Sequence, residues 1–108
     1  MKMALAGVAT IERVEVLGPK GPARHGGVDL LKWAREQLKL AAEIVDNPGG
    51  GLLFATQTIG QVRAGLADAD EERWKDVIRI LDRAEDSAVR RQYERSRELV
   101  AEALAQLG

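Results

Sequence analysis

The last third of the chain, residues 70–107, contains neither glycine nor proline. Its apolar residues recur at an interval of eleven in two adjacent rows, which are Val77, Ala88 and Leu99 and then Ile78, Val89 and Val100. Eleven residues over three turns is about 3.67 residues per turn, a period that keeps an apolar stripe along one side of an α-helix. Asp68, followed by Glu71, has the spacing of an N-terminal capping box. We therefore predict a long C-terminal helix over about residues 70–107.

A helix of that length would measure about 57 Å, whereas a compact domain of this size has a radius of gyration of about 13 Å. The helix must therefore break or project. Residues 85–98 are its weakest segment, because only Ala88, Val89 and Tyr93 are apolar there. Asp86 or Ser87 is suited to cap a new helix in this segment, but nothing forces a break. A projecting helix needs another chain to cover its stripe. With the N-terminal segment, it supplies the predicted oligomer interface, which comprises Val14, Val16, Trp74, Val77, Ile78, Leu81, Val89, Leu99 and Val100.

Two further helices are expected before this segment, at about residues 28–46 and 51–67. Charged residues of the first fall within an arc of about 100° on a helical wheel, and the rest of its surface is mostly apolar. This helix therefore needs neighbours on two sides, and it is central to the fold or to an interface. The "DNPGGG" sequence ends it in a turn, which predicts a helical hairpin. A strand over residues 54–59, "FATQTI", is the alternative for part of the second helix.

The N-terminal segment differs in composition from the rest. Residues 8–17 are rich in β-branched side chains and favour a strand that must pair with an edge elsewhere, with a frayed helix as the competing interpretation. Residues 18–27, "GPKGPARHGG", suit a solvated tether. The predicted organisation is an extended, β-like arm and tether over residues 1–27 and a helical domain over residues 28–108. The predicted fold class is all-α.

The sequence offers little for catalysis or metal binding. The absence of cysteine and the presence of only one histidine, His25, exclude the usual zinc arrangements, and no calcium-loop pattern occurs. Ser87 and Ser96 are the only serines, and neither has a histidine nearby in the chain. The glycines of "NPGGGLLFAT" lack the Lys and Ser or Thr of a nucleotide-binding loop. We expect no catalytic residue, no metal and no cofactor, and therefore no enzyme.

Charge and hydropathy restrict the partners. The formal net charge of −1 gives no global attraction to nucleic acid, and no apolar run is long enough to span a bilayer. We expect a cytoplasmic protein without a membrane partner.

The leading functional hypothesis is an assembly or adaptor protein that acts as a homo-oligomer or binds another protein, as small virion or secretion components do by analogy. The alternative is a small nucleic-acid-binding regulator. Its contact residues would be Lys20, Arg24, Arg79, Arg83, Arg90 and Arg97. Acidic residues share the face of the last four arginines, and this mixture favours a solvated, salt-bridged surface.

Overall fold

The computed structural model describes residues 26–108, and within that range it contains four α-helices and no strand. The helices are α1 (Gly26–Ile44), α2 (Gly51–Asp70), α3 (Lys75–Val89) and α4 (Tyr93–Leu107). The all-α prediction is confirmed for these residues, and the alternative strand at residues 54–59 is wrong because this segment lies inside α2. The predicted strand at residues 8–17 lies outside the described residues.

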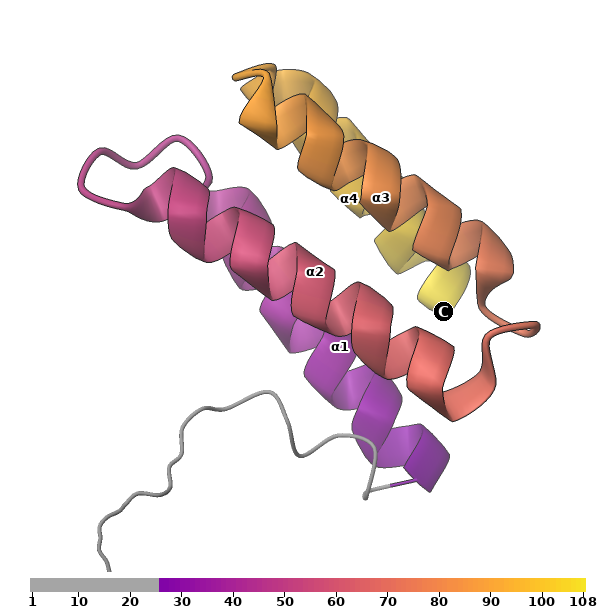
Figure 1. The fold of residues 1–108 in the computed structure, drawn as a ribbon. Helices are drawn as coiled ribbons and strands as arrows, with labels where there is room; N and C mark the ends of the chain where they lie inside the picture. Colours follow the sequence, from indigo (N-terminus) through magenta and orange to yellow (C-terminus); the bar gives the residue numbers. More distant parts are fainter. Residues whose placement is uncertain (1–25) are drawn as a thin grey trace, which may run out of the picture.

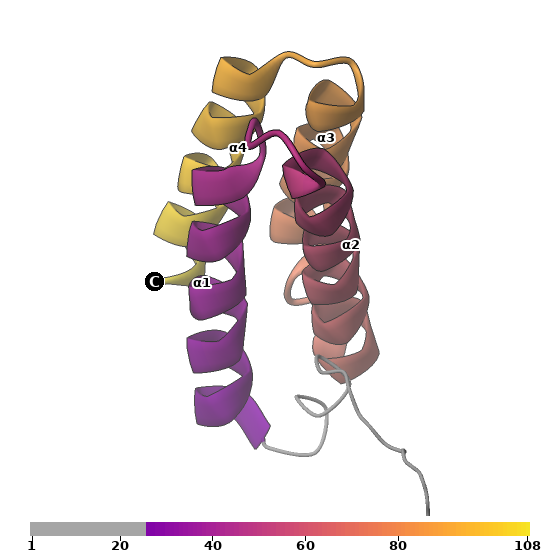
Figure 2. The ribbon, with the colours of Figure 1, turned by 90° about the vertical axis from the view of Figure 1, so that its left-hand side faces the viewer.

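The four helices form a ring in which each lies beside two others. α1 packs against α2 and α4, while α3 packs against α2 and α4, and no Cα atoms of the diagonal pairs come within 8 Å of one another. Successive helices run in opposite directions, as Figure 1 shows, and Figure 2 shows α1 beside α4 and α2 beside α3. This is the up-down-up-down arrangement of a four-helix bundle. Its largest fully buried side chains are Leu38, Ile59, Leu66, Leu81, Leu99, Val45, Val62, Val100 and Ser96.

The turn between α1 and α2 is built on three consecutive glycines. Gly49 and Gly50 have φ angles of 86° and 109°, in the left-handed region that side chains with a Cβ rarely adopt. Gly51 begins α2 so close to the end of α1 that a Cβ at this position would overlap the carbonyl oxygen of Ile44. The turn therefore fixes the register of the two helices, with Gly51 level with Ile44.

Of the two alternatives for the helix expected over residues 70–107, the structure shows the break rather than the projection, because the chain reverses twice in the C-terminal third. α2 extends to Asp70, so Asp68 lies inside a helix rather than capping one. The first reversal follows at residues 71–74. There the carboxylate of Asp70 accepts the backbone N–H of Arg73 at 3.1 Å. The carbonyl of Asp70 accepts the N–H of Trp74 at 3.2 Å.

The second reversal, at residues 90–92, contains neither glycine nor proline. Arg91 has a φ of 64°, and it is the only non-glycine residue with positive φ in the described part of the chain. The N–H of Arg91 donates to the carbonyl of Ala88, and the N–H of Gln92 donates to that of Ser87, both at 2.9 Å. These two bonds form a Schellman motif, which ends a helix by satisfying its last carbonyls. Here an arginine takes the left-handed position that glycine usually occupies.

The reversal allows α3 and α4 to bury their apolar sides against one another within a single chain. Small residues line the contact, and the hydroxyl of Ser96 in α4 donates to the carbonyl of Ala84 in α3 at 2.8 Å. Val77 and Ala88 in α3 and Leu99 in α4 are all buried. The first eleven-residue row thus marks core positions, but of two antiparallel helices rather than of one long helix. In the second row Val100 is buried, Ile78 is partly buried and Val89 is exposed.

Candidate functional site

The structure divides the predicted oligomer interface into covered and open positions. Five of its members, Trp74, Val77, Leu81, Leu99 and Val100, are buried within the chain's own core. Trp74 is also covered by the guanidinium of Arg73, which lies 4.5 Å from the ring centroid. Ile78 is partly buried, and Val89 is 60% exposed near the end of α3. Val14 and Val16 lie outside the described residues.

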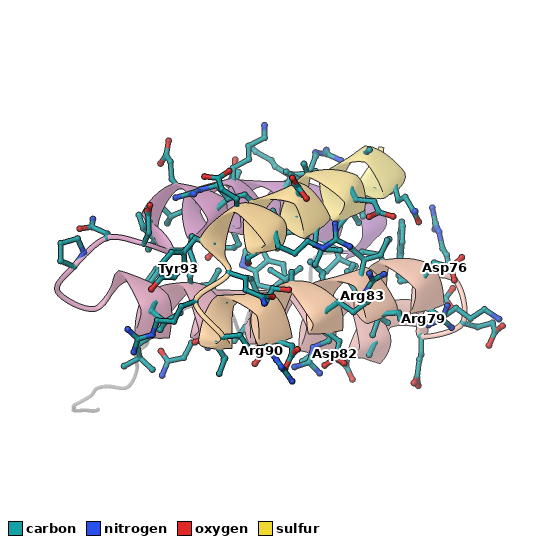
Figure 3. All side chains as sticks on the ribbon, turned by 90° about the horizontal axis from the view of Figure 1, so that it is seen from above. Asp76, Arg79, Asp82, Arg83, Arg90 and Tyr93 are labelled. Carbon is teal, nitrogen blue, oxygen red and sulfur yellow. The ribbon has the colours of Figure 1, made fainter. Side chains whose placement is uncertain are left out.

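The predicted arginine stripe does not form one continuous surface. Arg79 and Arg83 lie on α3 and Arg90 directly follows its last residue, as Figure 3 shows, whereas Arg97 lies on the antiparallel α4. Arg79 pairs with Asp76 at 3.5 Å, and Arg90 pairs with Asp86 at 3.0 Å. Acidic side chains thus lie beside these arginines. Lys20 and Arg24, the other members of the predicted nucleic-acid surface, lie outside the described residues.

Arg97 connects α4 to the end of α1. Its guanidinium pairs with Asp46 at 2.7 Å and with Glu94 at 2.8 Å. Its Nε also donates to the carbonyl of Ala42 at 3.0 Å. The hydrogen bond from Arg97 lowers the pKa of Asp46 below its usual value, and the pKa of Arg97 is raised by the same bond. These contacts assign Arg97 a structural role, which is to hold α1 and α4 together.

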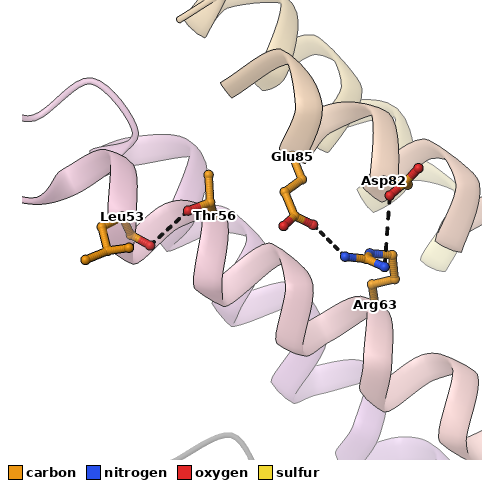
Figure 4. Close-up of polar contacts among 5 residues, drawn as sticks. All are labelled: Leu53, Thr56, Arg63, Asp82 and Glu85. Atoms are coloured by element: carbon orange, nitrogen blue, oxygen red, sulfur yellow. Dashed lines mark hydrogen bonds and ion pairs between the residues drawn. The ribbon is translucent and has the colours of Figure 1, made fainter. Parts of the chain in front are cut away.

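A polar groove of about 380 Å³ runs beside α3 and reaches α2. It is lined by Arg63, Asp82, Arg83, Glu85, Asp86 and Val89. Arg63 in α2 approaches two carboxylates of α3, Glu85 at 2.6 Å and Asp82 at 4.0 Å, as Figure 4 shows. The Nε of Arg63 is buried without a hydrogen-bond partner.

The chemistry of the polar groove suits the joining of two helices better than ligand binding. Its carboxylates outnumber its guanidinium groups, so it does not concentrate positive charge for an anion. The residues of the helical bundle also contain no group of three or more metal-ligating side chains. The side chain of Arg63 is 34% exposed, so its ion pair with Glu85 is partly screened by solvent. We interpret the groove as a salt-bridged seam between α2 and α3.

The main exposed apolar feature of α1 lies on the side that faces away from α4. Arg35, Ala42 and Asp46 mark the α4 side, because Arg35 donates to the carbonyl of Gly108 and Arg97 contacts the other two. On a helical wheel Trp33, Leu40 and Ile44 lie within about 40° of one another, on the opposite side of α1. They therefore follow the seam between α1 and α2.

Phe54 continues this surface onto α2. It lies about 180° around α2 from Arg63, which faces α3, so Phe54 is on the α1 side. Gly51 is level with Ile44. Because α1 and α2 are antiparallel, one turn forward along α2 and one turn back along α1 bring Phe54 level with Leu40. Leu40 is 38% exposed and Phe54 is 44% exposed, while Trp33 and Ile44 are partly buried against the core. We call these four residues, Trp33, Leu40, Ile44 and Phe54, the apolar strip.

A charged row borders the apolar strip on α1. It comprises Lys32, Glu36, Lys39 and Glu43, all of them exposed. Lysine and glutamate alternate along the helix in this row. On the strip side, Gln37 lies between Trp33 and Leu40 and carries no charge.

Two further exposed apolar residues, Leu53 on α2 and Val89 near the end of α3, lie outside the apolar strip. Leu53 is 61% exposed on the same side of α2 as Gly60, the residue that lies near Glu85 of α3. Val89 lines the polar groove. Both residues are more exposed than Leu40 and Phe54, and Val89 shares the polar groove with the carboxylates of Asp82, Glu85 and Asp86.

Comparison with known protein families, with curated proteins and with solved structures finds no match for this chain. A search of the described residues for a helix able to cross a membrane also finds none.

The sequence contained the signal for the apolar strip. Trp33, Leu40 and Ile44 make the first helix apolar on a second side, which predicted a second neighbour. Sequence reasoning missed Phe54, because the helical repeat in α2 marks Ala55, Ile59 and Val62 as the buried side and leaves Phe54 off it.

Proposed function

We propose that the protein is a non-enzymatic assembly or adaptor protein that acts as a homo-oligomer, and that the apolar strip is its binding surface. The observation that carries this proposal is the exposure of Leu40 and Phe54 beside partly buried Trp33 and Ile44. Aromatic residues in an apolar surface with a polar border are typical of binding hot spots. Burying this strip against a partner would remove apolar surface from water.

The rest of the described surface supports binding rather than catalysis. A catalytic site usually needs an enclosed pocket with titratable groups whose pKa values are shifted toward their task. In the described residues, the shifted groups are Asp46 and Arg97, and they are partners in one exposed ion pair. The polar groove contains charged groups in pairs rather than a positioned nucleophile and base.

The apolar strip replaces most of the interface predicted from the sequence. Burial of Val77, Leu81 and Leu99 leaves them unavailable to a partner in the folded chain. Val14 and Val16 stay predicted contacts of the N-terminal segment. The nucleic-acid alternative loses Arg97 from its stripe, since this side chain joins α4 to α1.

The experiment is multi-angle light scattering of the full chain over a range of concentrations. We expect association that is lost when the strip is made polar by Leu40→Ser with Phe54→Ser. The matched control is Leu53→Ser with Val89→Ser, which removes two apolar residues that lie outside the strip and are at least as exposed. Circular dichroism confirms that each variant keeps its helix content. A chain that stays monomeric up to about 1 mM, or association that survives the strip variant, would refute the proposal.

A further inference from the structure

The charged row on α1 is antisymmetric about its own midpoint. Lys32 and Glu43 lie equally far from a point between Gln37 and Leu38, and Glu36 and Lys39 lie equally far from the same point. Reversing the direction of the helix about this point therefore places a lysine where each glutamate was. Two copies of α1 in antiparallel contact would bring Lys32 opposite Glu43 and Glu36 opposite Lys39.

From this pattern we infer that the partner of the apolar strip is a second copy of the chain, docked α1 against α1 in antiparallel orientation about a two-fold axis between Gln37 and Leu38. The inference rests on the proposed function, because it specifies the partner for the same strip. Two-fold contacts are self-complementary, so every pair occurs twice. The interface would thus contain four Lys–Glu pairs.

The apolar strip fits the same symmetry axis. In an antiparallel pair, Trp33 of one copy lies opposite Ala42 of the other copy. Ile44 is two residues, or about 3 Å along the helix, from that position. Leu40 then packs near Gln37 of the other copy. The strip lies on one side of the α1 pair and the charged row on the other, as in coiled coils whose apolar seam is bordered by charge pairs.

Charge complementarity also decides the orientation. A parallel pair of α1 helices in register would bring Lys39 against Lys39 and Glu36 against Glu36, and like charges in contact are repulsive. The docking surface also keeps clear of α4, since Arg35, Ala42 and Asp46 occupy the other side of α1 and contact residues of the same chain.

The test uses charge reversal at the central pair, measured as the dimer dissociation constant by analytical ultracentrifugation of the full chain. Glu36→Lys alone places a lysine opposite Lys39 of the partner copy, and the two-fold axis makes this contact occur twice. We expect dimerisation to weaken about tenfold, because two exposed attractive pairs become repulsive. Lys39→Glu alone should weaken it to a similar extent. The double variant Glu36→Lys with Lys39→Glu restores opposite charges in the antiparallel pair, so its dissociation constant should return close to that of the wild type.

Net charge is controlled in two ways. The double variant has the same net charge as the wild type, so its recovery would not come from general repulsion. Glu102→Lys makes the same charge change as Glu36→Lys at an exposed position on α4, and it should leave dimerisation nearly unchanged. Raising the salt concentration should reduce the difference between Glu36→Lys and the wild type.

The results separate the inference from the proposed function. If the wild type associates and the strip variant does not, but the double charge variant is as weak as the single variants, the antiparallel geometry is wrong and the strip still binds. Single variants that dimerise as well as the wild type would also overturn the inference. A wild-type chain that remains monomeric would overturn both.

Discussion

Replacing Arg91 by glycine is expected to stabilise the fold. Arg91 is held at a φ of 64° by the Schellman motif that ends α3. A residue with a Cβ pays about 1–2 kcal/mol for left-handed geometry, and glycine loses about 0.5–1 kcal/mol more backbone entropy on folding. The difference predicts a net gain of about 0.5–1 kcal/mol for Arg91→Gly.

The assay is urea unfolding of the full chain, followed by far-UV circular dichroism. With an m-value of about 1 kcal/mol/M, the midpoint should rise by about 0.5–1 M. Arg91→Ala is the matched control, because it removes the same exposed guanidinium but keeps the Cβ. We expect its stability to stay within about 0.5 kcal/mol of the wild type. Each curve is repeated at a lower protein concentration, so that self-association appears as concentration dependence. Arg91→Gly being no more stable than Arg91→Ala would refute the reasoning.

Four further substitutions test the packing and the polar contacts of the bundle. Gly51→Ala should lower the free energy of unfolding by about 2 kcal/mol, because the new Cβ would overlap the Ile44 carbonyl. Gly60→Ala should raise it by about 0.5–1 kcal/mol, because the nearest atom to the new Cβ lies 3.7 Å away. Thermal unfolding compares the two, and equal melting temperatures would contradict the close approach of α1 and α2. Ser96→Ala should cost about 1 kcal/mol by losing the buried bond to Ala84, and no loss in urea unfolding would show that this bond contributes nothing. Asp46→Asn should reduce stability at neutral pH. Because Arg97 lowers the folded-state pKa of Asp46, the carboxylate contributes above its unfolded pKa of about 3.9 and loses that contribution as pH falls through the lower folded value. The gap between wild type and Asp46→Asn should therefore close in strong acid, and an undiminished gap there would be inconsistent with the ion pair.

The sequence predicts the helical character of residues 26–108 because its local signals agree. Helical periodicity, the glycine turn at residues 49–51 and the scarcity of other breakers all favour helices. The same periodicity could not locate the reversal at Arg91. An eleven-residue row looks alike in one long helix and in two antiparallel helices, and an arginine in left-handed geometry carries no sequence signal. Tertiary packing of α3 on α4 decides that conformation.

The candidate site was predictable only in part, for a related reason. The apolar side of α1 that contains Trp33 and Leu40 indicated that α1 has a second neighbour. It did not indicate which of the sides of α1 would be covered by helices of the same chain. The contacts of Arg97 with Ala42 and Asp46 settle this point, and they join residues far apart in the sequence. An arginine that pairs across helices looks, in the sequence, the same as one that faces solvent.

The ring of helices closes on itself where Arg35 of α1 donates to the carbonyl of Gly108, just beyond α4. The first and last helices are neighbours, and each of the four helices is antiparallel to both of its neighbours (Figure 2). The architecture therefore does not depend on where along the ring the chain is opened. A circular permutant that joins α4 to α1 by a short linker and opens the turn between α2 and α3 would trace the same bundle.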